Sequence, residues 1–183
     1  MKVSKLLTQG VVLAAIGGVG QAHALATLDF QDLTCAATQA QCGVENVYSA
    51  KGFTLSFVPG ADDPYQTGLQ AVGKLWQYNI RGTIAVNPNS CNGTVTLVNA
   101  KGAAFSMLSI DLAEANGNGP SAVTFVGTRL DGSKVTKAVQ LDGKAGWQRV
   151  ALPSNFTKLK SVVWSQGDCT NVTPHMFDNI LLN

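Results

Sequence analysis

Short stretches of alternating apolar and polar residues run through most of the chain after residue 25. Val, Thr, Ile and Phe are frequent in these stretches, and Gly, Asn, Asp and Pro separate them. Alternation with a period of two between turn-forming residues is typical of strands, whereas helical periodicity of useful length is missing. The sequence therefore predicts an all-β domain with ten strands: Ala26–Gln31, Gly52–Val58, Thr83–Val86, Gly93–Val98, Ala104–Glu114, Ala122–Leu130, Lys134–Leu141, Trp147–Leu152, Leu159–Ser165 and Met176–Leu182.

The turn signals in the second half suggest how these strands connect. Asp131-Gly132 stands between two alternating runs, which predicts a β-hairpin with a type I′ turn, because glycine accepts a positive φ. Nine or ten strands joined in this way fit a two-sheet antiparallel β-sandwich or a jelly roll. No repeat, low-complexity tract or linker divides the chain, so residues 25–183 are predicted to form a single domain.

Residues 59–92 form a long stretch with fewer strand signals, and long irregular segments in compact domains often carry function. Trp76 and Tyr78 lie two residues apart, which places both rings on one face of an extended segment. Such rings can stack on the apolar faces of pyranoses, although burial of both in the core is an open alternative. Trp147 and Trp164 lie on apolar strands and are assigned to the core. The candidate ligand-binding residues are Tyr65, Trp76, Tyr78, Asp62, Asp63, Asn87 and Asn89.

The first 24 residues have the layout of a secretory signal peptide. Lys2 and Lys5 are followed by an uncharged apolar stretch, Val11–Val19, and Ala22-His23-Ala24 is a small-x-small cleavage signature. The apolar stretch is short for a membrane span, although an N-terminal membrane anchor is the alternative interpretation. No later run approaches 18 apolar residues, so we expect no membrane association after cleavage.

The net charge and the titratable residues limit the functions that this chain can have. The formal net charge is +2, and removal of Lys2 and Lys5 from the thirteen basic residues leaves eleven, equal to the eleven acidic ones. The absence of net charge on the chain after the predicted signal peptide argues against a nucleic-acid partner. This part of the chain keeps one histidine, His175, for which a surface or capping role is predicted, so a Ser or Cys nucleophile with a histidine base is disfavoured. A polysaccharide hydrolase needs only two carboxylates. The candidate acids for such a pair are Glu45, Asp62, Asp63, Asp111 and Glu114.

All four cysteines follow the predicted signal peptide, and an even number in an exported chain indicates two disulfides. They can pair in three ways. The six-residue loop between Cys35 and Cys42 favours that pair, which leaves Cys91 with Cys169. The longer loop would stabilise the fold by roughly 4–5 kcal/mol in the chain-entropy model. A zinc site is the competing interpretation, but the spacings are not CxxC.

Several stretches together resemble the exported β-sandwich domains of bacterial proteins that carry PEP-CTERM sorting tails. The stretches are Leu28–Leu33, Phe105–Ala113, Val123–Ser133, Ser161–Trp164 and Phe177–Ile180. The resemblance implies a jelly-roll fold similar to carbohydrate-binding modules and galactose-binding-like domains. It also implies a place outside a Gram-negative bacterium. The chain stops at Asn183 without a Pro-Glu-Pro motif or a terminal apolar helix, so free secretion is expected.

The same resemblance implies a metal site and a function. In carbohydrate-binding jelly rolls the first and last strands pair, and their acids often share a structural calcium. The matching residues are Asp29, Asp32 and Asp178, although Asp178 in a turn and a solvated Asp29 are the plainer alternative. We expect a secreted, non-enzymatic module that binds a glycan. The rivals are a structural or adhesive protein of the extracellular matrix and a polysaccharide hydrolase, and the sequence leaves the oligomeric state open.

Overall fold

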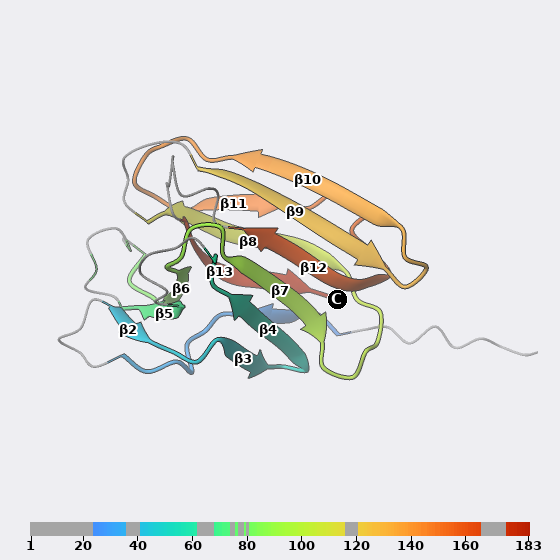
Figure 1. Cartoon of the computed structure of the whole chain (residues 1–183), viewed down its shortest axis with the longest axis horizontal. Helices are drawn as coiled ribbons and strands as arrows, with labels where there is room; N and C mark the ends of the chain where they lie inside the picture. The colour runs from blue at the N-terminus through green and yellow to red at the C-terminus, as the bar shows by residue number, and fades with distance from the viewer. Residues whose placement is uncertain are drawn as a thin grey trace, which may run out of the picture.

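The strands of this chain form two antiparallel sheets that lie face to face (Figure 1). The computed structural model describes residues 24–35, 41–61, 68–73, 76, 79, 81–115, 121–165 and 175–183. One sheet has seven strands: β1 (Ala26–Leu28), β2 (Gln41–Gly43), β5 (Leu69–Val72), β6 (Ala85–Pro88), β8 (Met107–Glu114), β11 (Gln148–Ala151) and β13 (His175–Leu182). The other has six: β3 (Val47–Ala50), β4 (Phe53–Val58), β7 (Thr94–Asn99), β9 (Ala122–Arg129), β10 (Lys134–Gln140) and β12 (Leu159–Ser165).

The strand order explains which segments meet. The six-stranded sheet runs β10-β9-β12-β7-β4-β3, from top to bottom in Figure 1. The seven-stranded sheet runs β11-β8-β13-β6-β5-β2, and β1 pairs with the second half of β13. The predicted two-sheet antiparallel β-sandwich is thereby confirmed, and the described residues contain no helix. Within them, no helical segment is long and apolar enough to cross a membrane.

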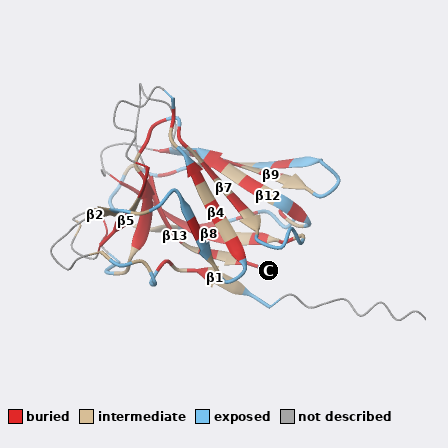
Figure 2. Cartoon of the chain, turned by 60° about the horizontal axis from the view of Figure 1, so that its bottom comes forward, coloured by how far each residue is buried: buried red, intermediate tan, exposed pale blue. Residues whose placement is uncertain are grey.

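The core lies between the two sheets. The Trp164 ring is 1% exposed and sits between the rings of Phe125 and Phe177, with centroids 5.6 and 5.4 Å away. Strands β4 and β7 alternate between buried and less buried residues, as the banded colours in Figure 2 show. Strands β6, β8 and β13 are buried at nearly every position. The seven-stranded sheet is therefore covered on its outer face as well as on its inner one.

All ten predicted strands are present, with shifted ends. The first ends at Leu28 and not at Gln31, because Phe30 adopts a left-handed φ of 55° and the Leu33 amide donates to its carbonyl in a turn. The prediction missed β2, β3 and β5, which have only three or four residues each. A period of two cannot be recognised over so few positions.

The predicted hairpin between β9 and β10 is confirmed, but its predicted turn type is wrong. A type I′ turn requires a positive φ at both central residues, and only Gly132 has one, at 83°. The Arg129 amide donates to the Ser133 carbonyl, so the loop is residues 130–132. A loop of three residues with glycine in the left-handed position is a common hairpin connection. Asp131 closes it by accepting a hydrogen bond from the Ser133 amide at 2.9 Å.

The first predicted disulfide is confirmed. Cys35 and Cys42 are bonded, with Cα atoms 5.7 Å apart, and they tie the segment after β1 to β2. Cys91 is also disulfide-bonded. Its predicted partner, Cys169, lies outside the described residues, as does the predicted signal peptide up to residue 23.

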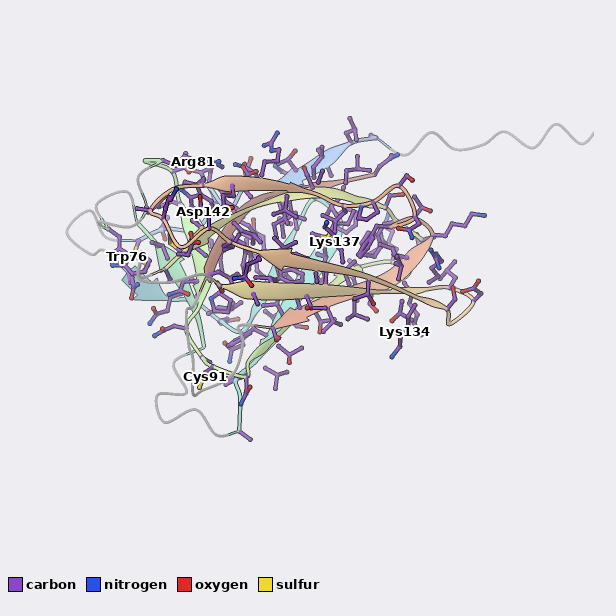
Figure 3. All side chains as sticks on the ribbon, turned by 90° about the horizontal axis from the view of Figure 1, so that it is seen from above. Trp76, Arg81, Cys91, Lys134, Lys137 and Asp142 are labelled. Atoms are coloured by element: carbon purple, nitrogen blue, oxygen red, sulfur yellow. A yellow bond between two sulfur atoms is a disulfide. The ribbon has the colours of Figure 1, made fainter. Side chains whose placement is uncertain are left out.

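Lysine side chains on the edge strand β10 oppose its pairing with another chain. Lys134 and Thr136 lie on its outer face, while Lys137 stands between Val135 and Val139 on the face that points into the sandwich. An inward-pointing charge on an edge strand opposes strand addition, because pairing would bury it. Figure 3 shows Lys134 and Lys137 well away from Cys91.

Gly127 on β9 supports a prediction about the core. A Cβ atom at this position would lie 2.8 Å from Leu159 Cδ2 and 2.9 Å from Val135 Cγ1. Gly127→Ala should therefore overpack the core and lower the free energy of unfolding by about 1–3 kcal/mol in urea titrations. Gly43→Ala is the control, because nothing lies within 4 Å of the added atom. Equal stability of the two variants would contradict this account of the packing.

Candidate functional site

The outer face of the seven-stranded sheet holds a group of buried polar side chains. Along β8, Ile110 and Leu112 point into the main core, so Asp111 and Ala113 between them point outward. The same alternation on β13 directs Phe177 inward and Met176 and Asp178 outward. Asp111 and Asp178 are register partners on the two strands, and each has a side chain that is 1% exposed.

Asp111 is held by three donors from three different segments. Arg149 on β11 donates from Nε to Oδ1 at 2.9 Å and from Nη2 to Oδ2 at 3.3 Å, which is a two-pronged contact. Arg81 Nη1 forms a short hydrogen bond to Oδ2, and Asn179 Nδ2 donates to the same oxygen at 3.1 Å. Burial alone would raise the pKa of Asp111, but these hydrogen bonds outweigh it and hold the pKa below its ordinary value.

Asp178 lies beside this group in a different environment. Its Oδ1 accepts the Asn179 amide at 2.7 Å, and its Oδ2 accepts Thr83 Oγ1 at 3.2 Å. Arg81 Nη1 is 3.8 Å from Oδ2. Burial raises the pKa of Asp178 to about 6, because its contacts with Asn179, Thr83 and Arg81 do not compensate for the lost hydration. The nearby Asp111 charge raises the pKa further.

A bulge in β13 makes this arrangement possible. The pairing of β13 with β8 shifts between Asp178 and Leu181, and Asn179 adopts a positive φ of 47°. Asparagine tolerates this conformation better than most residues. The bulge turns the Asn179 side chain toward both carboxylates while Ile180 returns to the core.

A loop between β5 and β6 places Arg81 and Trp76 over the same face. Asn79 is 1% exposed, and its Nδ2 donates to the carbonyls of Val72, Gly73 and Thr83 at 3.2, 3.3 and 2.6 Å. These bonds close the loop. Trp76 is half-buried and packs against a small outer cluster of Val72, Ala85, Ala113, Ala115 and Met176.

Trp147 packs against the same outer cluster from the other side of the site. It precedes β11, in a segment held by Asp142, which accepts from the Lys144 amide and Gln148 Nε2, both at 3.0 Å. The Arg81 guanidinium lies 4.8 Å above the Trp147 ring centroid, which is within the range of a cation–π contact. Figure 3 shows Trp76, Arg81 and Asp142 at the end of the molecule away from Lys134.

The assignment of both Trp147 and Trp164 to the core is correct for Trp164 only. The strand starts at Gln148, so Trp147 falls in the preceding segment and lies half-buried on the outer face. Asn87 is a second polar group of this face. It is 2% exposed and pairs in register with Gln70, and in each of these amides the carbonyl oxygen has no hydrogen-bond partner among the residues that the structure describes.

The predicted ligand-binding residues meet different outcomes. Trp76 and Asn87 lie on the outer face just described, and Asn89 is half-buried just beyond β6, with its amide bonded to the Gly68 carbonyl at 3.1 Å. Asp62, Asp63, Tyr65 and Tyr78 lie outside the described residues. Arg81, Arg149 and Trp147 were not predicted as ligand-binding residues. Their only signal was a basic or aromatic residue in or beside an apolar run.

The structure does not bring the predicted calcium ligands together. Although β1 and β13 pair as expected, Asp29 bonds to Lys51 at 3.1 Å and Asp32 accepts the Tyr48 hydroxyl at 2.7 Å. Asp178 contacts Thr83 and Asn179. No group of three or more His, Cys, Asp or Glu residues in the described part of the chain is placed to hold a metal ion. Each of the three carboxylates therefore has partners of its own.

The predicted surface or capping role of His175 is wrong. It is the first residue of β13 and is 0% exposed, because it shares the inward-facing register of Phe177. Burial lowers its pKa to about 3, so the ring is neutral at physiological pH. This histidine belongs to the packed interior.

Comparisons with known proteins give similarity of architecture only. No family model matches the sequence, and no curated protein matches it. A family 29 carbohydrate-binding module (CBM29-2) in complex with mannohexaose is 10% identical with a TM-score of 0.41, over 87% of this chain and 90% of that one. The CBM22-1 and GH10 modules of an endo-1,4-β-D-xylanase from Clostridium thermocellum, in complex with xylohexaose, are 12% identical with a TM-score of 0.45.

That match covers 86% of this chain but only 28% of the xylanase chain. A family 11 carbohydrate-binding module from Clostridium thermocellum, in complex with a β-1,3-1,4-mixed-linked tetrasaccharide, is 11% identical with a TM-score of 0.39. It aligns over 78% of this chain and 94% of its own. At these values no ligand or residue role is transferred, and the function is argued from the side chains of this chain.

The raised pKa of Asp178 predicts a pH effect on stability. The folded carboxyl, with a pKa of about 6, takes up its proton at a higher pH than the ordinary value of 3.8. The free energy of unfolding therefore rises as the pH falls from 7 to 4, by about 2–3 kcal/mol from this group. Asp178→Asn removes the titration, so urea unfolding should show the difference between the two proteins changing by that amount. A difference that is constant with pH would contradict the assignment.

Proposed function

We propose that this chain is an exported, non-catalytic module that binds an extracellular carbohydrate on the outer face of its seven-stranded sheet. One observation carries the proposal. Trp76 and Trp147 are fixed against one outer cluster, on the face where Arg81, Arg149 and Asp111 form a network. Sugar rings combine apolar C–H faces with hydroxyl groups, so they match fixed indoles beside polar groups.

The two tryptophans are suited to stacking because they are packed against the sheet and still partly exposed. Both residues are half-buried, and both pack against the outer cluster that includes Val72, Ala113 and Met176. A ring that is already ordered loses little conformational entropy when a ligand binds. Amphipathic indoles also provide a large contact area for few rotatable bonds.

The polar side chains supply directional contacts. A guanidinium carries five N–H donors, and the bonds of Arg149 to Asp111 use Nε and Nη2. The buried carbonyl oxygens of Asn87 and Gln70 on the same face accept no hydrogen bond from the described part of the chain. A few such polar groups within apolar surroundings are typical of sites that bind small molecules.

A hydrolase is less well supported by the acids that suggested it. Asp111 is fully engaged by Arg81, Arg149 and Asn179, and its lowered pKa suits a permanent charge, not proton transfer. Glu114 is 1% exposed and accepts the Gly143 amide at 2.7 Å. Glu45 is exposed on the opposite side, in a groove with Asp32 and Tyr48.

The adhesive or matrix role has one specific observation in its favour. Edge strand β3 carries no charged side chain, and Val47 on it is 56% exposed. An unguarded edge is a site where a second copy could pair. The lysines of β10 oppose the same event at the other edge of this sheet. Assembly through β3 would appear as a mass that rises with concentration in light scattering.

The export part of the proposal rests on the Cys35–Cys42 disulfide and on the N-terminal pattern. Disulfides persist in oxidising compartments outside the cytosol.

Trp76→Ala tests the proposed function. In affinity electrophoresis through soluble polysaccharides, including β-mannan, xylan and polygalacturonate, the wild type should be retarded by at least one. Loss of the indole should weaken that binding about tenfold, which corresponds to ~1.4 kcal/mol.

Leu130→Ala is the matched control, because Leu130 is a 58% exposed apolar residue at the turn after β9. It should bind like the wild type. Binding by Trp76→Ala that equals the control, with both variants folded, would refute a site on this face.

A further inference from the structure

The charges of the proposed site are unequally exposed. The side chains of Arg149 and Arg81 are 65% and 29% exposed, whereas those of Asp111 and Asp178 are each 1% exposed. The carboxylates thus lie beneath the guanidinium groups. A ligand that approaches this face meets positive charge first, although the mature chain is predicted to be neutral overall.

The two guanidinium groups also share a single strong partner. Arg81 Nη1 and Arg149 Nη2 both contact Asp111 Oδ2, the latter at 3.3 Å. Asp178 is 3.8 Å from Arg81 and is the only other carboxylate in ion-pair contact with either arginine among the described residues. Because both guanidinium groups share one carboxylate oxygen, other N–H groups of the two arginines can donate hydrogen bonds to a further anion. The planar guanidinium group suits the geometry of a carboxylate.

The other charged groups near this face are few. Asp142 and Lys144 are exposed neighbours on the segment before Trp147, and they carry opposite charges. Glu114 lies on the inward register of β8, where it holds the Gly143 amide. Asp62, Asp63 and Lys74 lie outside the described residues.

We propose that the carbohydrate bound here is an acidic polysaccharide, and that Arg81 and Arg149 bind its carboxylate groups while the sugar ring packs against Trp76 and Trp147. This inference rests on the proposed function, because it names the ligand class of the same site. Arg81 connects the charged groups of the site to its aromatic residues, because its guanidinium lies 4.8 Å from the Trp147 ring centroid. A uronate sugar presents a carboxylate next to an apolar ring face, which is the same combination.

The site also gains positive charge in mild acid. Asp178 has a pKa of about 6, so it becomes neutral between pH 7 and pH 5, while the pKa of Asp111 is held below its ordinary value. The carboxylates of a uronate polysaccharide stay ionised in this range. Binding of an acidic polysaccharide should therefore strengthen as the pH falls from 7 to 5, and added salt should weaken it.

The experiment compares two acidic polysaccharides, polygalacturonate and alginate, each with its methyl-esterified form. Esterification removes the charge and leaves the sugar backbone unchanged. Affinity electrophoresis and calorimetry should show that the wild type binds at least one acid form about tenfold or more tightly than its ester, since hydrogen bonds to charged groups are the stronger ones.

Arg149→Gln should remove most of that preference, while binding of the uncharged ester form should weaken much less. Lys134→Gln is the matched control, because it makes the same change of charge on the edge of the other sheet, where Lys134 is exposed. The control should retain the wild-type preference. Arg81 and Asn179 still donate to Asp111 in this variant, so it is expected to fold, and its urea midpoint verifies this.

The outcomes separate the two proposals. Equal binding of acid and ester forms by the wild type overturns the acidic ligand and leaves the proposed function standing. Equal weakening by Lys134→Gln and Arg149→Gln overturns it too, because attraction would then be spread over the whole surface. No binding to any of these polysaccharides or to neutral ones by the folded protein overturns the proposed function itself.

Discussion

The arrangement of the outer sheet face depends on the burial of one charge. Asp111 is 1% exposed in the middle of β8, where an unpaired carboxylate would be strongly unfavourable. It is compensated by Arg81 from the loop before β6, Arg149 from β11 and Asn179 from the bulge in β13. Loss of these donors together would leave the buried carboxylate uncompensated, so segments that are distant in sequence meet at this point.

This constraint explains features that otherwise look unrelated. The positive φ of Asn179 directs its amide to Asp111 and Asp178. The loop closed by Asn79 ends at Thr83, which donates to Asp178, and it carries Arg81 to Asp111. With Arg81 fixed, its guanidinium covers part of Trp147. A network made to satisfy one carboxylate thereby also sets the positions of the two outer tryptophans and the exposed arginines.

The sequence predicted the scaffold well and the site only in part. Long alternating runs such as Lys134–Gln140 report their own structure, because period two is a local property. Cys35 and Cys42 were paired correctly because a short loop favours a local bond. Trp76 was selected for its neighbours in sequence. Its actual neighbours are Val72, Ala85, Ala113 and Met176, which come from four strands.

The sequence by itself determined the fold class, ten of the strands and the local disulfide, because each is encoded by residues close together in the chain. Tertiary structure decided which polar side chains share a face. Asp111, Arg149 and Asp178 meet because β11, β8 and β13 are neighbours in one sheet, although they are far apart in sequence. The same packing buried His175 and moved Trp147 out of the core, because the face a side chain takes depends on strand register, which only the assembled sheets fix.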